Sequence, residues 1–199
     1  MGLRETKKQA MREQIADAAM RLFVTRGFDH VTVAEIAQAV GVSEKTVFNY
    51  YPTKEDLFFD EAPERLRQLA DALRDRPDGE TIVGAVRRLQ LSQVDRLTQP
   101  GFAPFARVIE ESPALQMKEV DLMARFAQIL AAELQDQGVR ERDARVAAGL
   151  IMSVHRQFFR AARLLALDGN HGPAAARRLK ADMARAYEIL EHGVGATIG

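Results

Sequence analysis

The chain has 199 residues, of which 47% are hydrophobic and 28% charged, and its formal net charge is zero. This length and composition suit one large or two small globular domains, and the charge balance argues against a polybasic protein that coats any nucleic acid. The absence of cysteine excludes disulfides and thiolate metal sites. Because the first residues are polar and no apolar run approaches the roughly 18 residues that a bilayer requires, we expect a cytoplasmic protein with no membrane partner.

The first 40 residues contain the signals of two helices. The first is indicated by an apolar face that ends at Gly27, a residue suited to a left-handed helix cap. Thr32 and Glu35 have the spacing of a capping box, in which each side chain satisfies a free backbone amide of a new helix. We therefore expect a second, short helix over about 32–39.

A turn containing a glycine joins this helix to a third. Gly41 supplies the permissive backbone of the turn, Ser43 is a candidate N-cap, and Pro52 stops the helix after about Tyr50. Two short helices joined in this way form a helix-turn-helix arrangement, whose second helix can read bases in a DNA major groove. The outward-pointing residues of that helix would be Ser43, Glu44, Lys45, Thr46 and Asn49. The pattern alone leaves open that the helices only pack against the rest of the protein.

Aromatic residues close this third helix, at positions 48, 50 and 51. We expect one ring to pack inward and another to offer its hydroxyl to a DNA phosphate, although Phe48 and Tyr51 could both belong to the core. Thr53 begins the next helix, so the positive end of that helix and Lys54 would face the phosphate backbone.

The rest of the chain also has helical periodicity, and no stretch alternates with the period of a strand. The sequence therefore predicts an all-α fold of about nine helices. The expected later helices cover about 53–75, 80–98, 103–111, 113–138, 141–167 and 174–190.

The run TVAEIAQAVGVSEKTVFNYYPTKEDLF, residues 32–58, closely resembles the N-terminal DNA-binding segment of the TetR family of bacterial transcriptional regulators. The resemblance covers about residues 10–60. It implies a helix-turn-helix DNA-binding domain at 1–53, followed by a helical-bundle domain for effector binding and dimerisation at 54–199. By this analogy, Lys45 and Asn49 read bases, and phosphates are contacted by Thr32, Thr46, Tyr50 and Lys54. Phe48 stands where the family usually has tyrosine, so its ring would instead press on a thymine methyl group or a sugar.

The resemblance further implies a repressor that a small-molecule effector releases from a palindromic operator in double-stranded DNA. Such proteins are homodimers through their last two helices, and the apolar stripes of 141–167 and 174–190 fit that interface, although they could also bury within their own domain. Candidates for the effector pocket are apolar or aromatic residues of the middle helices, each of which could be plain core: Phe102, Phe105, Ile109, Met123, Phe126, Met152, His155 and Phe159.

Other classes of function remain as alternatives. A helical enzyme is disfavoured because the sequence has no cysteine, no glycine-rich phosphate loop and no serine nucleophile motif. We expect no cofactor, and no metal because no histidine is paired with a carboxylate at ligand spacing. A helical adaptor that does not bind DNA is the other alternative. Retention on random duplex DNA with a steep salt dependence would separate a regulator from both.

Overall fold

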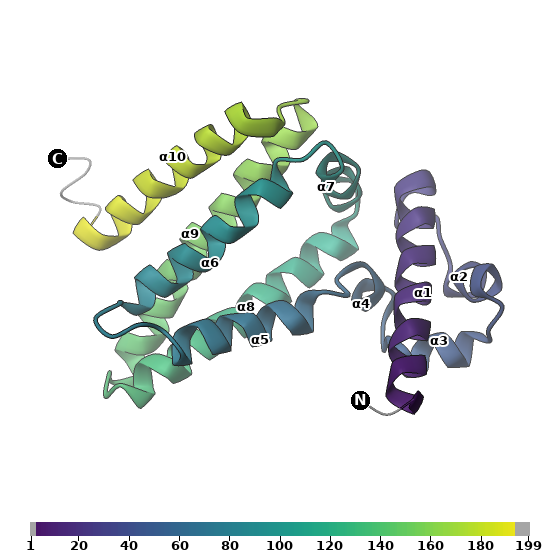
Figure 1. Ribbon diagram of the computed structural model, residues 1–199, viewed down its shortest axis with the longest axis horizontal. Helices are drawn as coiled ribbons and strands as arrows, with labels where there is room; N and C mark the ends of the chain where they lie inside the picture. The colour runs from purple at the N-terminus through teal and green to yellow at the C-terminus, as the bar shows by residue number, and fades with distance from the viewer. Residues whose placement is uncertain (1–2, 194–199) are drawn as a thin grey trace. The chain divides into compact units, whose positions relative to one another are not determined.

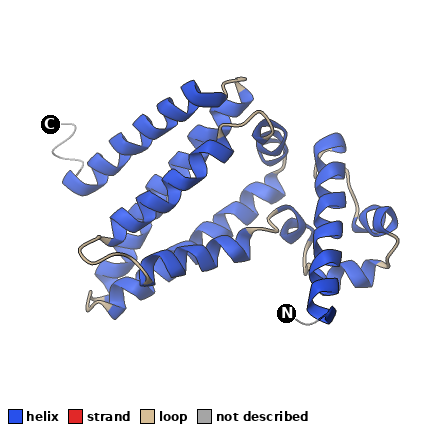
Figure 2. Cartoon of the chain, in the orientation of Figure 1, coloured by secondary structure: helices blue, strands red, loops and turns tan. Residues whose placement is uncertain are grey.

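The structure, a computed structural model, describes residues 3–193 as helices joined by short loops (Figures 1 and 2). Within that range there is no strand, and the predicted all-α class is confirmed. The helices are α1 (Leu3–Arg26), α2 (Val33–Val40), α3 (Glu44–Tyr50), α4 (Lys54–Phe58), α5 (Ala62–Arg74), α6 (Ile82–Leu97), α7 (Phe102–Glu111), α8 (Pro113–Asp136), α9 (Glu141–Leu167) and α10 (Gly172–His192).

These are ten helices where the sequence predicts about nine, because the segment 53–75 is broken. Helix α4 ends at Phe58, and α5 begins at Ala62. Pro63 has no amide hydrogen to donate to the carbonyl of Phe59, and its ring would crowd that carbonyl in a continuous helix. The first turn of a helix tolerates proline, so the chain starts a new helix there. The prediction of one continuous helix was wrong, and Pro63 is the signal that marks the break.

The described chain divides into two compact units. The first contains the residues up to Ala62 together with 108–118. Its core is aromatic: the rings of Phe23 and Phe28 lie 4.9 Å apart, and Phe58 lies 6.2 Å and 6.3 Å from them. Other buried members, from α1 to α4, are Ile15, Ala19, Ile36, Ala37, Val47 and Leu57. This core fixes α2 and α3 against α1.

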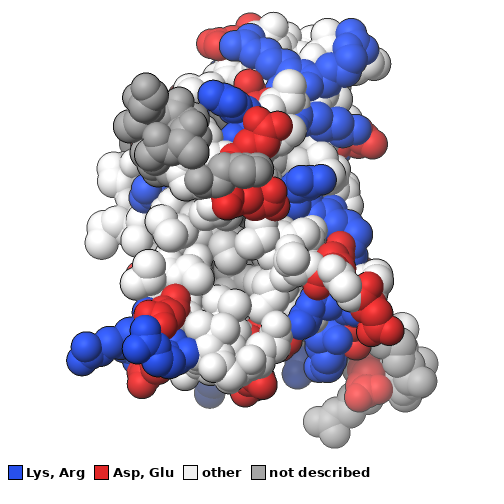
Figure 3. Space-filling view, turned by 90° about the vertical axis from the view of Figure 1, so that its left-hand side faces the viewer, with Lys and Arg blue, Asp and Glu red and all other residues white. Residues whose placement is uncertain are grey.

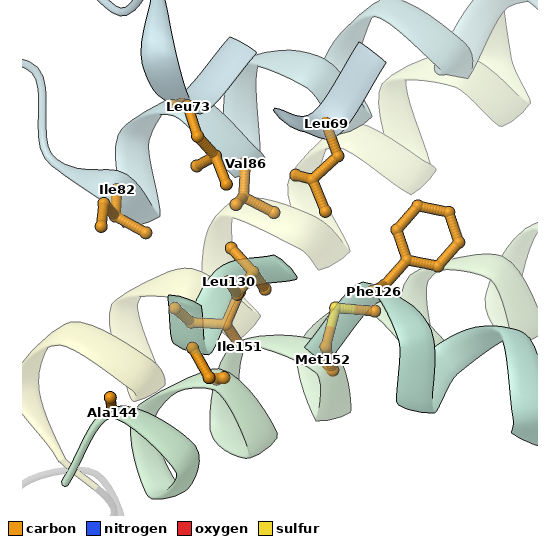
Figure 4. Close-up of a cluster of buried hydrophobic side chains, with 12 residues drawn as sticks. Leu69, Leu73, Ile82, Val86, Phe126, Leu130, Ala144, Ile151 and Met152 are labelled. Carbon is orange, nitrogen blue, oxygen red and sulfur yellow. The ribbon is translucent and has the colours of Figure 1, made fainter. Parts of the chain in front are cut away.

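The second unit contains residues 63–107 and the chain from Glu119 onward. It has two neighbouring apolar clusters. One joins α5 and α6 to α8 and α9, and its members include Leu69, Val86, Phe126, Leu130, Ile151 and Met152 (Figure 4). The other joins α6 and α9 to α10, and its members include Val94, Leu97, Phe158, Leu179, Met183 and Tyr187. Helix α8 begins in the first unit and continues into the second. The functional division at residues 53 and 54 stays a prediction.

The apolar stripes of α9 and α10 have different surroundings. On α10, Leu179 and Met183 are buried in the second unit's own core, and α10 runs beside α9 (Figure 1). On α9, Val146 and Leu150 are 63% and 54% exposed, and Leu164 is 48% exposed. Residues 146, 150 and 164 fall within about 40° of one another around a regular helix, so they share one face. Helix α9 therefore presents three large apolar side chains to solvent, on a face that also carries the exposed Ser153, Gln157 and Arg160.

The charged surface is mixed in sign. Figure 3 shows Lys and Arg side chains interleaved with Asp and Glu side chains around an uncharged area on one face of the molecule. Within residues 3–193, no helix is both long and apolar enough to cross a membrane.

Candidate DNA-binding surface and effector site

The turn between α2 and α3 is held by backbone and cap contacts. The Thr32 hydroxyl accepts from the Glu35 amide (3.3 Å), and the Glu35 carboxylate accepts from the Thr32 amide (2.8 Å), which confirms the capping box. Gly41 has φ +72°, a left-handed conformation that suits glycine. The Val42 amide donates to the Ala37 carbonyl (3.0 Å) and completes the turn. These contacts set the direction in which α3 leaves α2.

Helix α3 packs against the rest of the first unit through one side and exposes the other side to solvent. Ser43 is its N-cap, with the hydroxyl accepting from the Thr46 amide at 3.1 Å, and Val47 is its buried residue. Thr46 and Tyr50 are half-buried, while Ser43, Glu44, Lys45, Phe48 and Asn49 are exposed. Phe48 is 45% exposed, a large fraction for a phenylalanine. The candidate base-reading residues thus lie on an accessible, mostly polar face.

The adjacent tyrosines have opposite environments. Tyr51 is buried, and its hydroxyl donates to Asp60 Oδ1 at 2.7 Å and lies 3.0 Å from the Arg12 carbonyl. Arg12 completes the cluster, because its guanidinium pairs with the same Asp60 oxygen (2.7 Å) and stacks 4.6 Å from the Tyr51 ring. Burial and the hydrogen bond to Asp60 raise the pKa of Tyr51. The inward ring expected from the sequence is therefore Tyr51, while the half-buried Tyr50 is the candidate for phosphate.

Lys54 has a structural task that the sequence did not indicate. Its ammonium donates to the carbonyls of Phe28 (3.0 Å) and Val31 (3.1 Å) and lies 4.1 Å from the centre of the Phe28 ring. A lysine ammonium has three donors. Two of them hold the loop between α1 and α2, which leaves one donor for any further contact.

The start of α4 is tied to the start of α8. Asp56 completes a capping box with Thr53 and pairs with Lys118 Nζ at 2.7 Å. Burial alone would raise the pKa of Asp56, but the hydrogen bonds from Lys118 and Thr53 outweigh it and hold the pKa below its usual value. This ion pair anchors the short α4, which carries Lys54, within the first unit.

The structure does not bring all the candidate effector residues together at one place. Phe126, His155 and Phe159 come together, with ring centroids 5.6 Å and 4.8 Å from His155. Met152 belongs to the same apolar cluster as Phe126, and the partly buried Met123 packs against that cluster. Phe102 and Phe105 stack on each other at 5.7 Å, and Phe102 packs against the second cluster. Ile109 is buried in the first unit, apart from the unit that contains the others.

Gln90 of α6 is a polar neighbour that the sequence analysis missed. It is 2% exposed, and its amide nitrogen lies 2.6 Å from His155 Nδ1. A glutamine in an amphipathic helix gives no local sign of burial, and its partner lies 65 residues away in the chain. Among the described residues, no three His, Asp or Glu side chains gather as a metal site would require.

Comparisons with known proteins show which regulators this chain is similar to. The profile described as "Bacterial regulatory proteins, tetR family" matches residues 15–60. The transcriptional regulator TcmR of Streptomyces glaucescens is 30% identical over 146 residues, 66% of this chain and 63% of TcmR. The repressor AcnR of Corynebacterium jeikeium is 34% identical over 76 residues, 38% of each chain. The match thus spans less than two thirds of these relatives' lengths.

Among solved structures, Thermus thermophilus FadR is described as a TetR-family transcriptional repressor in complex with lauroyl-CoA. It is 28% identical, with a TM-score of 0.53, and the superposition covers 92% of this chain and 94% of FadR. The helix-turn-helix geometry and these similarities agree: residues 15–60 match the TetR family of bacterial regulatory proteins, and the chain as a whole is similar to regulators of that family.

Proposed function

We propose that this protein is a cytoplasmic transcriptional repressor that binds a palindromic DNA operator and leaves it when a small-molecule effector binds. The observation that carries the proposal is the exposed polar face of α3 behind a well-capped turn. AcnR and FadR are named repressors and TcmR a regulator, which favours this class over a helical enzyme or an adaptor.

On DNA, the proposed contacts divide into two kinds. Lys45 and Asn49 read base edges, with Ser43 and Glu44 beside them at the start of α3, and Phe48 makes an apolar contact. Phosphates are bound by Thr32, Thr46, Tyr50 and Lys54, which set the position of α3 in the groove.

The proposed assembly is a homodimer, because one short recognition helix offers few contacts and a palindrome requires two of them. The exposed apolar side chains of α9 support this assembly, since Val146, Leu150 and Leu164 face solvent in the isolated chain. Helix α10, beside α9, would contribute its exposed alanines rather than its apolar stripe, which the chain's own core already buries.

The proposed effector binds in the second unit. The FadR complex with lauroyl-CoA supports a small-molecule ligand for a protein of this fold. Binding would release DNA by changing the separation of the two recognition helices, which must match half-sites about one turn, ~34–36 Å, apart. No contact between effector and DNA is needed.

Selection of bound duplexes from a random pool tests the proposal. We expect an inverted repeat whose half-sites are one helical turn apart, and affinity that falls steeply with salt. The Asn49→Ala variant, selected in parallel, should return a motif that is blurred at one position of each half-site. A pool that yields no enriched motif would reject a sequence-specific regulator, and an unchanged sharp motif from the variant would remove Asn49 from base reading.

A further inference from the structure

Gln90 and His155 form a polar pair between the two apolar clusters of the second unit. The Gln90 amide nitrogen lies 2.6 Å from His155 Nδ1, and with this nitrogen as the donor the ring proton of the neutral imidazole is on Nε2. Gln90 Oε1 is buried and has no hydrogen-bond partner among the described residues. Buried polar atoms in folded proteins are nearly always paired, so an unpaired one calls for an explanation.

The surroundings of this pair are aromatic and apolar. The His155 ring contacts those of Phe126 and Phe159. Met152 lies beside Phe126 (Figure 4). Burial, with a smaller effect from the Arg65 cation, lowers the pKa of His155 to about 4. The imidazole is therefore neutral at pH 7, and the pair offers no positive charge to an anion.

From this geometry we propose that Gln90 Oε1 accepts a hydrogen bond from the effector, which is a neutral molecule with a flat apolar body and one hydroxyl or N–H donor. The body packs against Phe126, His155 and Phe159, and the donor reaches the unpaired oxygen. The inference rests on the proposed function, because it assigns the ligand class of the effector site. A hydrogen bond to a buried acceptor discriminates strongly against an analogue that lacks the donor.

Three naphthalene probes test the proposal with the full chain. 2-Naphthol has the donor, 2-methoxynaphthalene has a methyl group in its place, and 2-naphthoate is an anion of similar size. Since the chain contains no tryptophan, the fluorescence of the probes can be followed directly. We expect 2-naphthol to bind at least tenfold more tightly than either analogue.

The Gln90→Leu variant should lose this preference, so that the ratio of the affinities for 2-naphthol and 2-methoxynaphthalene falls to about one. Gln90→Met, an unbranched replacement, provides a second test if the leucine variant does not fold, as judged by its helical circular dichroism. The matched control is Gln128→Leu, the same substitution at an exposed position of α8, which should keep the tenfold preference.

Equal binding of 2-naphthol and its methyl ether to the wild-type chain would overturn the inference, as would tighter binding of 2-naphthoate or an unchanged preference in both Gln90 variants. DNA binding by the wild-type chain is measured separately, without any probe. A chain that binds its selected operator but shows no preference for the donor contradicts this inference alone. A chain that shows the preference but binds no DNA contradicts the proposed regulator instead.

Discussion

At the scale of single residues, Tyr50 and Tyr51 provide a matched pair. Removing the Tyr51 hydroxyl deletes its bond to Asp60 and leaves the Arg12 carbonyl without that donor. We expect Tyr51→Phe to lower the free energy of unfolding by about 1–3 kcal/mol, because hydrogen bonds to charged groups contribute in that range. Urea denaturation followed by circular dichroism measures the loss.

Tyr50→Phe should weaken DNA binding and leave stability almost unchanged. Its hydroxyl is proposed to bind a phosphate, so the free energy of unfolding should change by less than about 0.5 kcal/mol, while affinity for the operator should fall about tenfold. Equal stability losses in the two variants would show that the inward and outward assignments of these rings are mistaken.

Lys54 tests whether one side chain can serve both the fold and DNA. Lys54→Ala deletes the donors to the Phe28 and Val31 carbonyls and should reduce stability by about 1–2 kcal/mol. If the third donor binds a phosphate, the slope of log affinity against log salt should also become shallower by about one. Lys45→Ala, at an exposed site, should leave stability within about 0.5 kcal/mol. A reduced stability with an unchanged salt slope would assign Lys54 to the fold alone.

At the scale of helices, the cap of α2 responds to acid. The bond from the Thr32 amide, followed by those from Arg26 and the Thr32 hydroxyl, lowers the pKa of Glu35 from 4.5 to about 2. A carboxyl with a depressed pKa in the folded state stabilises the fold above its unfolded pKa, and this contribution is lost as the pH falls through the folded value. The stabilisation by Glu35 should therefore disappear between about pH 4.5 and pH 2.

Two variants separate charge from capping. Glu35→Gln keeps an acceptor for the Thr32 amide but cannot titrate, so its deficit relative to wild type should shrink as the pH falls from 5.5 to 3. Glu35→Ala removes the acceptor as well and should be the less stable variant at pH 5.5. Urea denaturation at both pH values measures these differences. A deficit of Glu35→Gln that stays constant over this range would mean that the Glu35 carboxylate does not stabilise the fold through its charge.

Helix boundaries were predictable wherever the determinant was local. Thr32 and Ser43 cap the helices that the sequence assigned to them, since a cap depends on residues three positions away, and Thr53 is the predicted cap of a helix that proves much shorter than expected. The break before α5 was missed, although Pro63 is a local signal that could have predicted it. The Gln90–His155 contact could not be predicted from the sequence, because it joins residues far apart in the chain. The same holds for the Asp56–Lys118 ion pair.

Periodicity shows that one side of a helix is apolar but not what covers it. Leu179 and Met183 of α10 are buried by the chain's own core, whereas Val146 and Leu150 of α9, read as part of an equivalent stripe, face solvent. Phe48 shows the same limit in α3, where the aromatic pattern allowed a core ring and the structure has an exposed one. The three-dimensional structure is needed to distinguish an apolar stripe that belongs to the core from one that is exposed and available to a partner.

At the scale of the whole molecule, the exposed face of α9 carries the dimer proposal. The double variant Val146→Glu, Leu150→Glu places carboxylates on both sides of a two-fold interface, where like charges repel and lose hydration. We expect this variant to be a monomer by light scattering at concentrations where the wild type is a dimer. Its affinity for the palindromic operator should fall on the order of 100-fold or more, since two linked sites bind far more tightly than one.

Val120→Glu provides the control, because Val120 is equally exposed (61%) but lies on α8. It should leave both the dimer and operator binding intact. Circular dichroism must show that the double variant keeps the helical content of the wild type, so that a loss of affinity reflects assembly. If the folded double variant remains a dimer, the interface lies elsewhere than the α9 face. If it is a folded monomer that still binds the palindrome with wild-type affinity, each recognition helix binds independently, and the two-fold arrangement on DNA is excluded.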